Sequence, residues 1–68
     1  MSRQSQSSKT IVPGTFRQFG PFGPVYKILR ATTRQNDRGE PLFVIEVPES
    51  GERVHYSSAR IFADPEVR

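Results

Sequence analysis

The stretch Leu42-Phe43-Val44-Ile45-Glu46-Val47 is the most apolar run of the chain and decides its fold class. Its Val, Ile and Phe side chains favour β structure, and the run is too short for more than about two turns of helix. Because successive positions are apolar, both faces of such a strand should be at least partly covered. We therefore expect 42–47 to be the central strand of a small β-sheet.

Turn signals on both sides of this run separate it from two further strands. Pro48 ends it, and Glu49-Ser50-Gly51-Glu52 suits a hairpin loop that leads into Arg53-Val54-His55-Tyr56, with Val54 and Tyr56 pointing inward. On the other side, Val25–Thr33 is rich in β-branched and aromatic residues and ends in the polar turn Arg34–Gly39. The three segments predict a meander of consecutive antiparallel strands.

The ends of the folded region are less regular. Thr15–Phe19 predicts a short first strand, and Gly20-Pro21-Phe22-Gly23-Pro24 must form a loop because proline cannot donate to a sheet ladder. After the last strand, Ser57-Ser58 can cap one or two helical turns over 59–63, and residues 66–68 are expected to fray.

These elements predict an all-β domain: a small four-stranded antiparallel meander, curled into a partly open SH3-like barrel, with a short C-terminal helical turn over an open end. A flat sheet that dimerises face to face is the rival. The expected core is apolar, with Phe16, Phe19, Val25, Ile28, Leu29, Leu42, Val44, Ile45, Val47, Val54, Tyr56, Ile61 and Phe62.

Length and composition limit the domain organisation. The chain has 68 residues, so it has room for one domain, and it has no cysteine for disulfides or for a thiolate metal site. We expect residues 1–12 to be a disordered, basic Ser/Gln-rich tail and 13–68 to be a single small β domain. A cysteine-free chain without an apolar leader or spanning segment favours the cytoplasm and no membrane contact.

No pattern indicates catalysis, a cofactor or a metal ion. The only histidine, His55, is expected on the solvent face of its strand, without a nucleophile or orienting carboxylate at a recognisable spacing. Glu49 and Glu52 flank a hairpin loop, and Asp37 belongs to a turn that lacks the ligand alternation of a calcium loop. An enzyme would need a pocket around His55 with a carboxylate in reach, and we expect none.

Charge is distributed unevenly along the chain. Residues 1–34 hold six cations and no acid, whereas residues 35–68 hold four cations and seven acids. Basic residues interleaved with aromatic rings can bind nucleic acid, and the candidate contacts are Arg3, Lys9, Arg17, Lys27, Arg30 and Arg34. The alternative is cross-strand pairing, in which Lys27, Arg30 and Arg53 lie opposite Glu46, Glu52 or Glu40.

Phe22 stands between two Gly-Pro breaks, where its ring either folds back as a plug on the barrel end or stands exposed as a contact. We favour the plug. The short strand at Thr15–Phe19 could also offer an edge to another chain. The candidate protein contacts are Phe16, Phe19 and Phe22.

These observations lead to two hypotheses. The first is a non-enzymatic binding module that uses the strand edge or the Phe22 loop on a protein partner or on a second copy. An antidote to a neighbouring toxin would look the same. The alternative is a nucleic-acid-binding small β-barrel that uses the basic N-terminal half. No small-molecule ligand is implied.

Three segments carry a resemblance to a known family. Phe19–Tyr26, Glu49–Tyr56 and Ile61–Glu66 resemble a small family of short bacterial proteins known only as a domain of unknown function. The resemblance covers about Gly14 to Glu66, and it implies a bacterial or phage-derived protein. It implies no catalytic residue.

Overall fold

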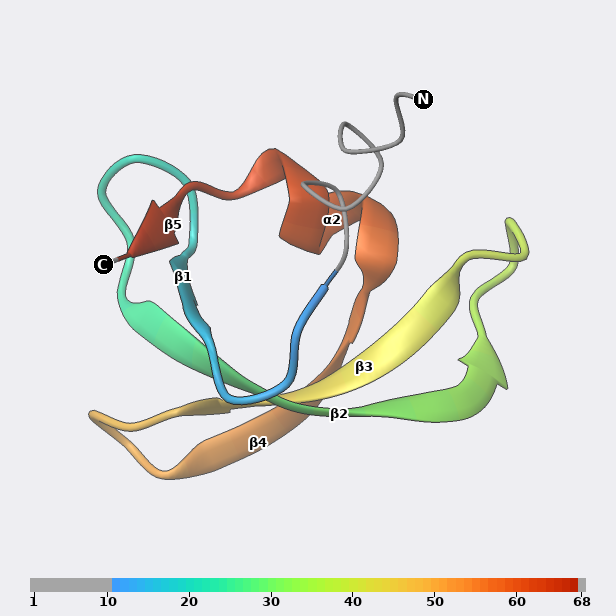
Figure 1. Cartoon of the computed structure of the whole chain (residues 1–68), viewed down its shortest axis with the longest axis horizontal. Coiled ribbons are helices and arrows are strands. Elements are labelled where there is room, and N and C mark those ends of the chain that lie inside the picture. The colour runs from blue at the N-terminus through green and yellow to red at the C-terminus, as the bar shows by residue number, and fades with distance from the viewer. Residues whose placement is uncertain (1–10, 68) are drawn as a thin grey trace, which may run out of the picture.

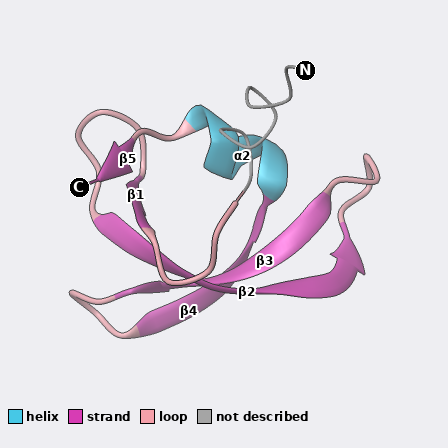
Figure 2. Cartoon of the chain, viewed as in Figure 1, coloured by secondary structure: helices cyan, strands magenta, loops and turns pink. Residues whose placement is uncertain are grey.

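The computed structural model describes residues 11–67, so the tail expected at 1–10 and Arg68 lie outside the described residues. In the described part, one antiparallel sheet of five strands is accompanied by one short helix (Figures 1 and 2). The predicted all-β class is therefore confirmed. The strands are β1 Phe16–Gln18, β2 Val25–Gln35, β3 Pro41–Val47, β4 Glu52–Ser57 and β5 Glu66–Val67. Their order in the sheet is β4-β3-β2-β1-β5, and the sheet does not close on itself.

Four of the strands lie where the sequence predicts them, and the fifth was missed. The last residues were expected to fray, yet Glu66 pairs with Arg17 and Val67 pairs with Phe16 across an antiparallel ladder. The backbone N–H of Gln18 also donates to the carbonyl of Pro65 at 3.0 Å.

The long strand β2 gives the sheet its curvature. Its first residues pair with β1, and from Lys27 onward it pairs with β3, with register irregularities between Ile28 and Arg30 and again beyond Ala31. Such bulges bend a strand and increase its twist. As a result β1 and β5 turn back over the β2–β3–β4 part of the sheet, and the helix lies on the same side (Figure 1).

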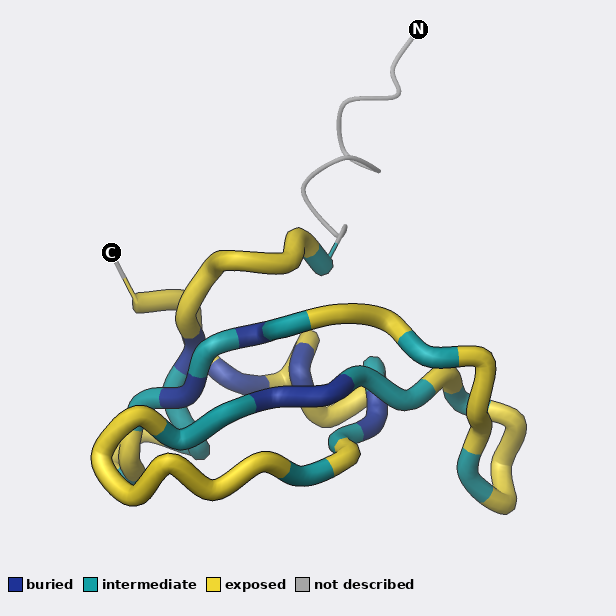
Figure 3. Tube along the Cα trace, turned by 90° about the horizontal axis from the view of Figure 1, so that it is seen from below, coloured by how far each residue is buried: buried dark blue, intermediate teal, exposed yellow. Residues whose placement is uncertain are grey.

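The core lies between the curled sheet and the helix. Tyr26, Ile28, Ile45 and Ile61 are completely buried, and burial falls off toward the hairpin ends (Figure 3). Phe16 and Phe62 were expected in this core, but they are 37% and 46% exposed. The half-buried residues packed against the core are Ile11, Phe19, Phe43, Val47, Val54 and Tyr56.

The predicted helical turn is present as α2, Ser58–Ala63. As expected, a serine caps it: the Ser57 hydroxyl accepts from the backbone N–H of Arg60 at 3.3 Å. Ile61 is the buried anchor of the helix, and Asp64 follows directly after its end. No helix within residues 11–67 is long and apolar enough to cross a bilayer.

The folded region begins earlier than expected. Ile11, assigned to the tail by sequence, is half-buried against the core, and the chain then runs alongside β2. There the N–H of Gly14 donates to the carbonyl of Ile28 at 2.7 Å, and the N–H of Ile28 donates to the carbonyl of Thr15 at 2.9 Å. Ile11 therefore belongs to the domain.

Candidate binding surfaces

Asp64 joins three parts of the molecule through one buried carboxylate. Its Oδ2 accepts the hydroxyl hydrogen bonds of Tyr26 at 2.8 Å and Tyr56 at 3.1 Å, and its Oδ1 accepts the backbone N–H of Gly20 at 3.0 Å. Those donors come from β2, from β4 and from the β1–β2 loop. The end of α2 is thus tied to the sheet and to the start of the loop.

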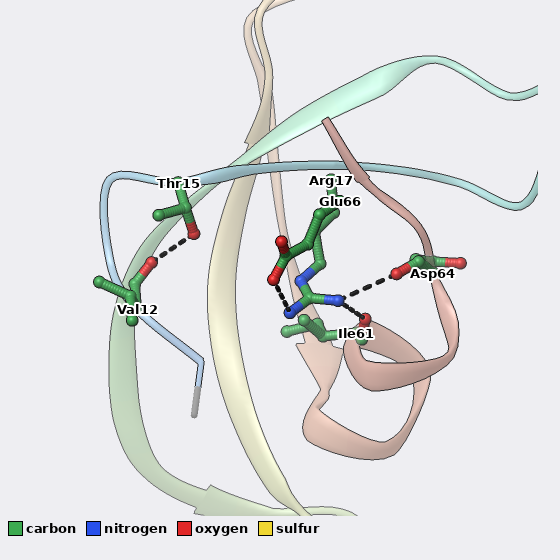
Figure 4. Close-up of polar contacts among 6 residues, drawn as sticks. All are labelled: Val12, Thr15, Arg17, Ile61, Asp64 and Glu66. Carbon is green, nitrogen blue, oxygen red and sulfur yellow. Dashed lines mark hydrogen bonds and ion pairs between the residues drawn. The ribbon is translucent and has the colours of Figure 1, made fainter. Parts of the chain in front are cut away.

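Arg17 completes this network from the first strand. Its Nη1 donates to the carbonyl oxygens of Ile61 at 3.1 Å and Asp64 at 2.9 Å, and its Nη2 pairs with Glu66 at 3.2 Å (Figure 4). The side chain is only 8% exposed, and its Nε has no partner. The guanidinium is thus buried and bound by the domain itself, which argues against the predicted contact of Arg17 with nucleic acid.

An aromatic cluster packs beside the Asp64 carboxylate. The ring of Phe19 lies 4.4 Å from that of Tyr26 and 5.3 Å from that of Tyr56 between centroids. Burial raises the pKa of Tyr26 far above its usual value, and the hydrogen bond to Asp64 raises it further. Burial also raises the pKa of Tyr56. Phe19 is partly buried and packs against the core, which argues against the protein contact that the sequence suggested.

Phe22 stands out from the surface. It is 94% exposed, so the expectation that it plugs the end of the barrel is wrong. The ring projects from a loop held by backbone bonds, in which Gly23 donates to the Phe19 carbonyl at 2.9 Å and Phe19 donates to the Pro24 carbonyl at 3.0 Å. The loop therefore presents Phe22 from a fixed backbone.

Two further contacts hold the same loop. The Nε2 of Gln18 donates to the carbonyls of Pro21 at 3.2 Å and Gly23 at 3.0 Å. Gly23 also lies so close to Phe19 that a Cβ on it would be 2.2 Å from the Phe19 carbonyl oxygen. Glycine is required here because of this close approach.

Strand β1 does not offer an edge. It pairs with β2 on one side and β5 on the other, so the prediction of a free edge at Thr15–Phe19 is wrong. Of the longer described strands, β4 is at the margin of the sheet, next to β3 alone. Its exposed Glu52, Arg53 and His55 are the charged and polar side chains that discourage edge pairing.

The outer face of the sheet, opposite the core, carries two of the remaining predicted cations, Lys27 and Arg30. In cross-strand register, Phe16 lies opposite Lys27, Lys27 opposite Glu46, and Glu46 opposite Arg53. Arg53 forms an ion pair with Glu46 at 3.4 Å, and the Lys27 amine lies 5.9 Å from the centre of the Phe16 ring. The predicted charge pairing is thus present in part, with one carboxylate between two cations.

Next to these residues, the same face has an open groove of about 190 Å³. It is lined by Arg30, Val44, Arg53, Val54 and His55. Arg30 and His55 lie on either side of Val44 in register, and Val44 is 6% exposed. The lining contains no carboxylate. His55 is exposed on its strand, as predicted, and its place beside two arginines was not predicted. The alternation that turns Val54 and Tyr56 inward could have placed Arg53 with His55.

The other candidates lie elsewhere. Arg34 is exposed near the end of β2, away from the groove lining, and Arg3 and Lys9 lie outside the described residues. Among residues 11–67, no group of three or more His, Asp or Glu side chains could hold a metal ion. The turn at Asp37 is formed by its neighbour Asn36, whose Oδ1 accepts the N–H groups of Arg38 and Glu40.

Fold and surfaces together define a class: a small, open, curled β-sheet domain with an exposed aromatic loop and a basic groove on the outer face. The chain belongs to the Family of unknown function (DUF5397), whose model matches residues 4–68. No curated protein is found to match the chain.

Proposed function

We propose that the domain is a non-enzymatic binding module that engages a protein partner through the Phe22 loop. The observation that carries this proposal is the 94% exposure of Phe22 on a loop whose backbone is held by hydrogen bonds. Exposing a large aromatic ring forgoes its burial, which is worth about 1.5–3 kcal/mol. A partner with an apolar pocket would recover that free energy.

The loop has the features of an energetically important contact. Aromatic side chains dominate the binding energy of protein interfaces, and a pre-organised backbone reduces the entropy lost on binding. Pro21 and Pro24, both exposed, flank the ring and widen the apolar tip. Because β1 is an interior strand and the β4 margin carries charged residues, the loop is the better supported of the two modes considered.

Two finer features of the protein are also inferred. A partly open barrel of the SH3-like kind is supported by the curl of the sheet, by the pairing of the first strand with the last, and by the helix between β4 and β5. A cytoplasmic setting stays a prediction, and its support is the cysteine-free composition. A bacterial origin also stays a prediction, and it rests on the resemblance of the segments named above.

Partner capture with a matched variant tests the function. The full chain and its Phe22→Ser variant are immobilised and exposed to a lysate of the source cells. Proteins that only the parent chain retains are then purified. We expect Phe22→Ser to weaken binding of the purified partner by about 30-fold or more, since truncated aromatic hot spots cost about 2 kcal/mol or more. Binding of every retained protein to both chains within twofold would contradict the proposal, as would a monomeric chain that retains nothing.

A further inference from the structure

The basic groove on the outer face is a second candidate site, separate from the Phe22 loop. Its lining residues come from β2, β3 and β4. Its two guanidinium groups come from strands that do not neighbour each other, Arg30 from β2 and Arg53 from β4, and His55 also lies on β4. Since adjacent strands lie about 4.8 Å apart, the backbones of Arg30 and His55 are about 10 Å apart across Val44. Arg53 lies roughly 7 Å from His55 along its strand.

We propose that this groove binds single-stranded nucleic acid, with phosphate groups at Arg30 and Arg53 and a base against His55. Guanidinium groups present planar pairs of donors that match phosphate oxygens. Imidazole and aromatic rings provide stacking surfaces for unpaired bases. The nearly buried Val44 between Arg30 and His55 provides an apolar floor.

The charge of the outer face supports an anionic ligand. Lys27, Arg30 and Arg53 are three cations on this face, and Glu46 is the acid in register with two of them. Glu46 can neutralise only one charge, so the face keeps a net positive charge. Because the ion pair with Arg53 is exposed and 3.4 Å long, that guanidinium can exchange Glu46 for a phosphate at little cost.

The shape of the site favours a single strand. At about 190 Å³ the groove is smaller than the roughly 300–1,000 Å³ of pockets that enclose a small molecule. Duplex DNA is read by inserting a helix or a two-stranded ribbon into its major groove, whereas single strands lie across open sheet faces and stack on their side chains. Here the short helix is on the opposite side of the sheet, and the outer face is open (Figure 1).

Fluorescence anisotropy with the full chain tests the proposal. Labelled oligo-dT and oligo-rU of about 12 nucleotides are titrated at about 50 mM and about 200 mM salt. We expect Arg30→Gln/Arg53→Gln to weaken binding roughly tenfold or more and to reduce the salt slope by about 1.4, since each phosphate contact contributes about 0.7. The single variant Arg30→Gln, which leaves the ion pair to Glu46 intact, should account for about half of the slope change.

The matched control is Arg34→Gln/Arg38→Gln, which removes the same charge from exposed positions outside the groove lining. We expect it to change affinity less than about twofold. Absence of binding by the parent chain at low salt overturns the proposal. Equal losses in the two double variants also overturn it, because they would show attraction by net charge alone.

Substitutions of His55 and a change of ligand test the stacking role and the ligand class. His55→Ala should weaken binding at least about fivefold, and His55→Phe should restore most of it, because a ring can stack whether or not it is charged. Equal losses in both variants overturn the stacking role. Equal affinity for a duplex of the same length, or for poly-glutamate, overturns the assignment to single-stranded nucleic acid. Phe22→Ser should leave nucleotide binding unchanged, which separates this site from the proposed protein contact.

Discussion

The carboxylate of Asp64 accepts a 2.8 Å hydrogen bond from the hydroxyl of Tyr26, and this contact ties the end of α2 to the longest strand of the sheet. The same carboxylate holds Tyr56 and the N–H of Gly20. The apolar core described within residues 11–67 is small, so this polar connection is a large part of what fixes the helix and the loop. It also determines the backbone from which Phe22 projects.

Asp64→Ala should strongly destabilise the domain. The change leaves the hydroxyls of Tyr26 and Tyr56 and the N–H of Gly20 without their acceptor in a buried region, and we expect a loss of about 2–4 kcal/mol in the free energy of unfolding. Chemical denaturation followed by circular dichroism measures it. Asp37→Ala, at an exposed turn, is the control and should change stability by less than about 0.5 kcal/mol. Similar effects of the two variants would contradict the role of Asp64.

Alkaline pH should unfold the protein through the two tyrosines. Burial raises the pKa of Tyr26 and Tyr56, while an unfolded chain has a tyrosine pKa of about 10. Stability from these groups is therefore complete below about pH 10 and is lost as the pH rises above it, because the unfolded chain then releases protons that the folded chain keeps.

Denaturation midpoints measured between about pH 8 and pH 11.5 test whether stability falls as the pH rises. We expect Tyr26→Phe to lower stability at neutral pH by about 1 kcal/mol, since a hydrogen bond to Asp64 is lost, and to make the decline above pH 10 shallower. Tyr26→Phe combined with Tyr56→Phe should flatten that decline further. An unchanged decline in the double variant would show that other groups cause it.

Local sequence signals were sufficient for four strands and the helix. Alternation of apolar residues, the Asn36 turn and the Ser57 cap act within a few residues, so they can be recognised without the fold. The pairing of β5 with β1 could not be recognised in this way. Strands of three and two residues are too short to show a repeating pattern, and the Arg17–Glu66 ion pair joins residues 49 apart in the sequence.

For the candidate surfaces too, local signals could be recognised in the sequence, whereas contacts between distant segments could not. The outward position of His55 followed from alternation along one strand, but its approach to Arg30 depends on a bulge and on β3 lying between them. The buried position of Arg17 could not be predicted from sequence either, because a basic residue beside Phe16 is typical of a surface cation. Only the fold shows that its guanidinium is buried against the carbonyls at the end of α2.

Gly23→Ala should distort the Phe22 loop. At a compatible position this change stabilises a protein by about 0.4–1 kcal/mol, but here the new Cβ would lie 2.2 Å from the carbonyl oxygen and 2.7 Å from the Cβ of Phe19. Because backbone cannot move aside cheaply, we expect a loss of about 2 kcal/mol or more. The comparison is Gly51→Ala, where φ is 76° but no atom lies within 4 Å, and the strain should cost about 1–2 kcal/mol. Denaturant midpoints that rank Gly51→Ala as the more damaging change would contradict the close contact.

Phe22→Ala and Phe19→Ala should separate binding from folding. Phe22 is 94% exposed, so its removal should change the free energy of unfolding by less than about 0.5 kcal/mol. Phe19 packs between Tyr26 and Tyr56, so its truncation should cost about 2–4 kcal/mol. Denaturant melts of the two variants, recorded beside the parent chain, measure both effects. A marked loss in Phe22→Ala would mean that the ring stabilises the fold, and its value as an isolated binding contact would then disappear.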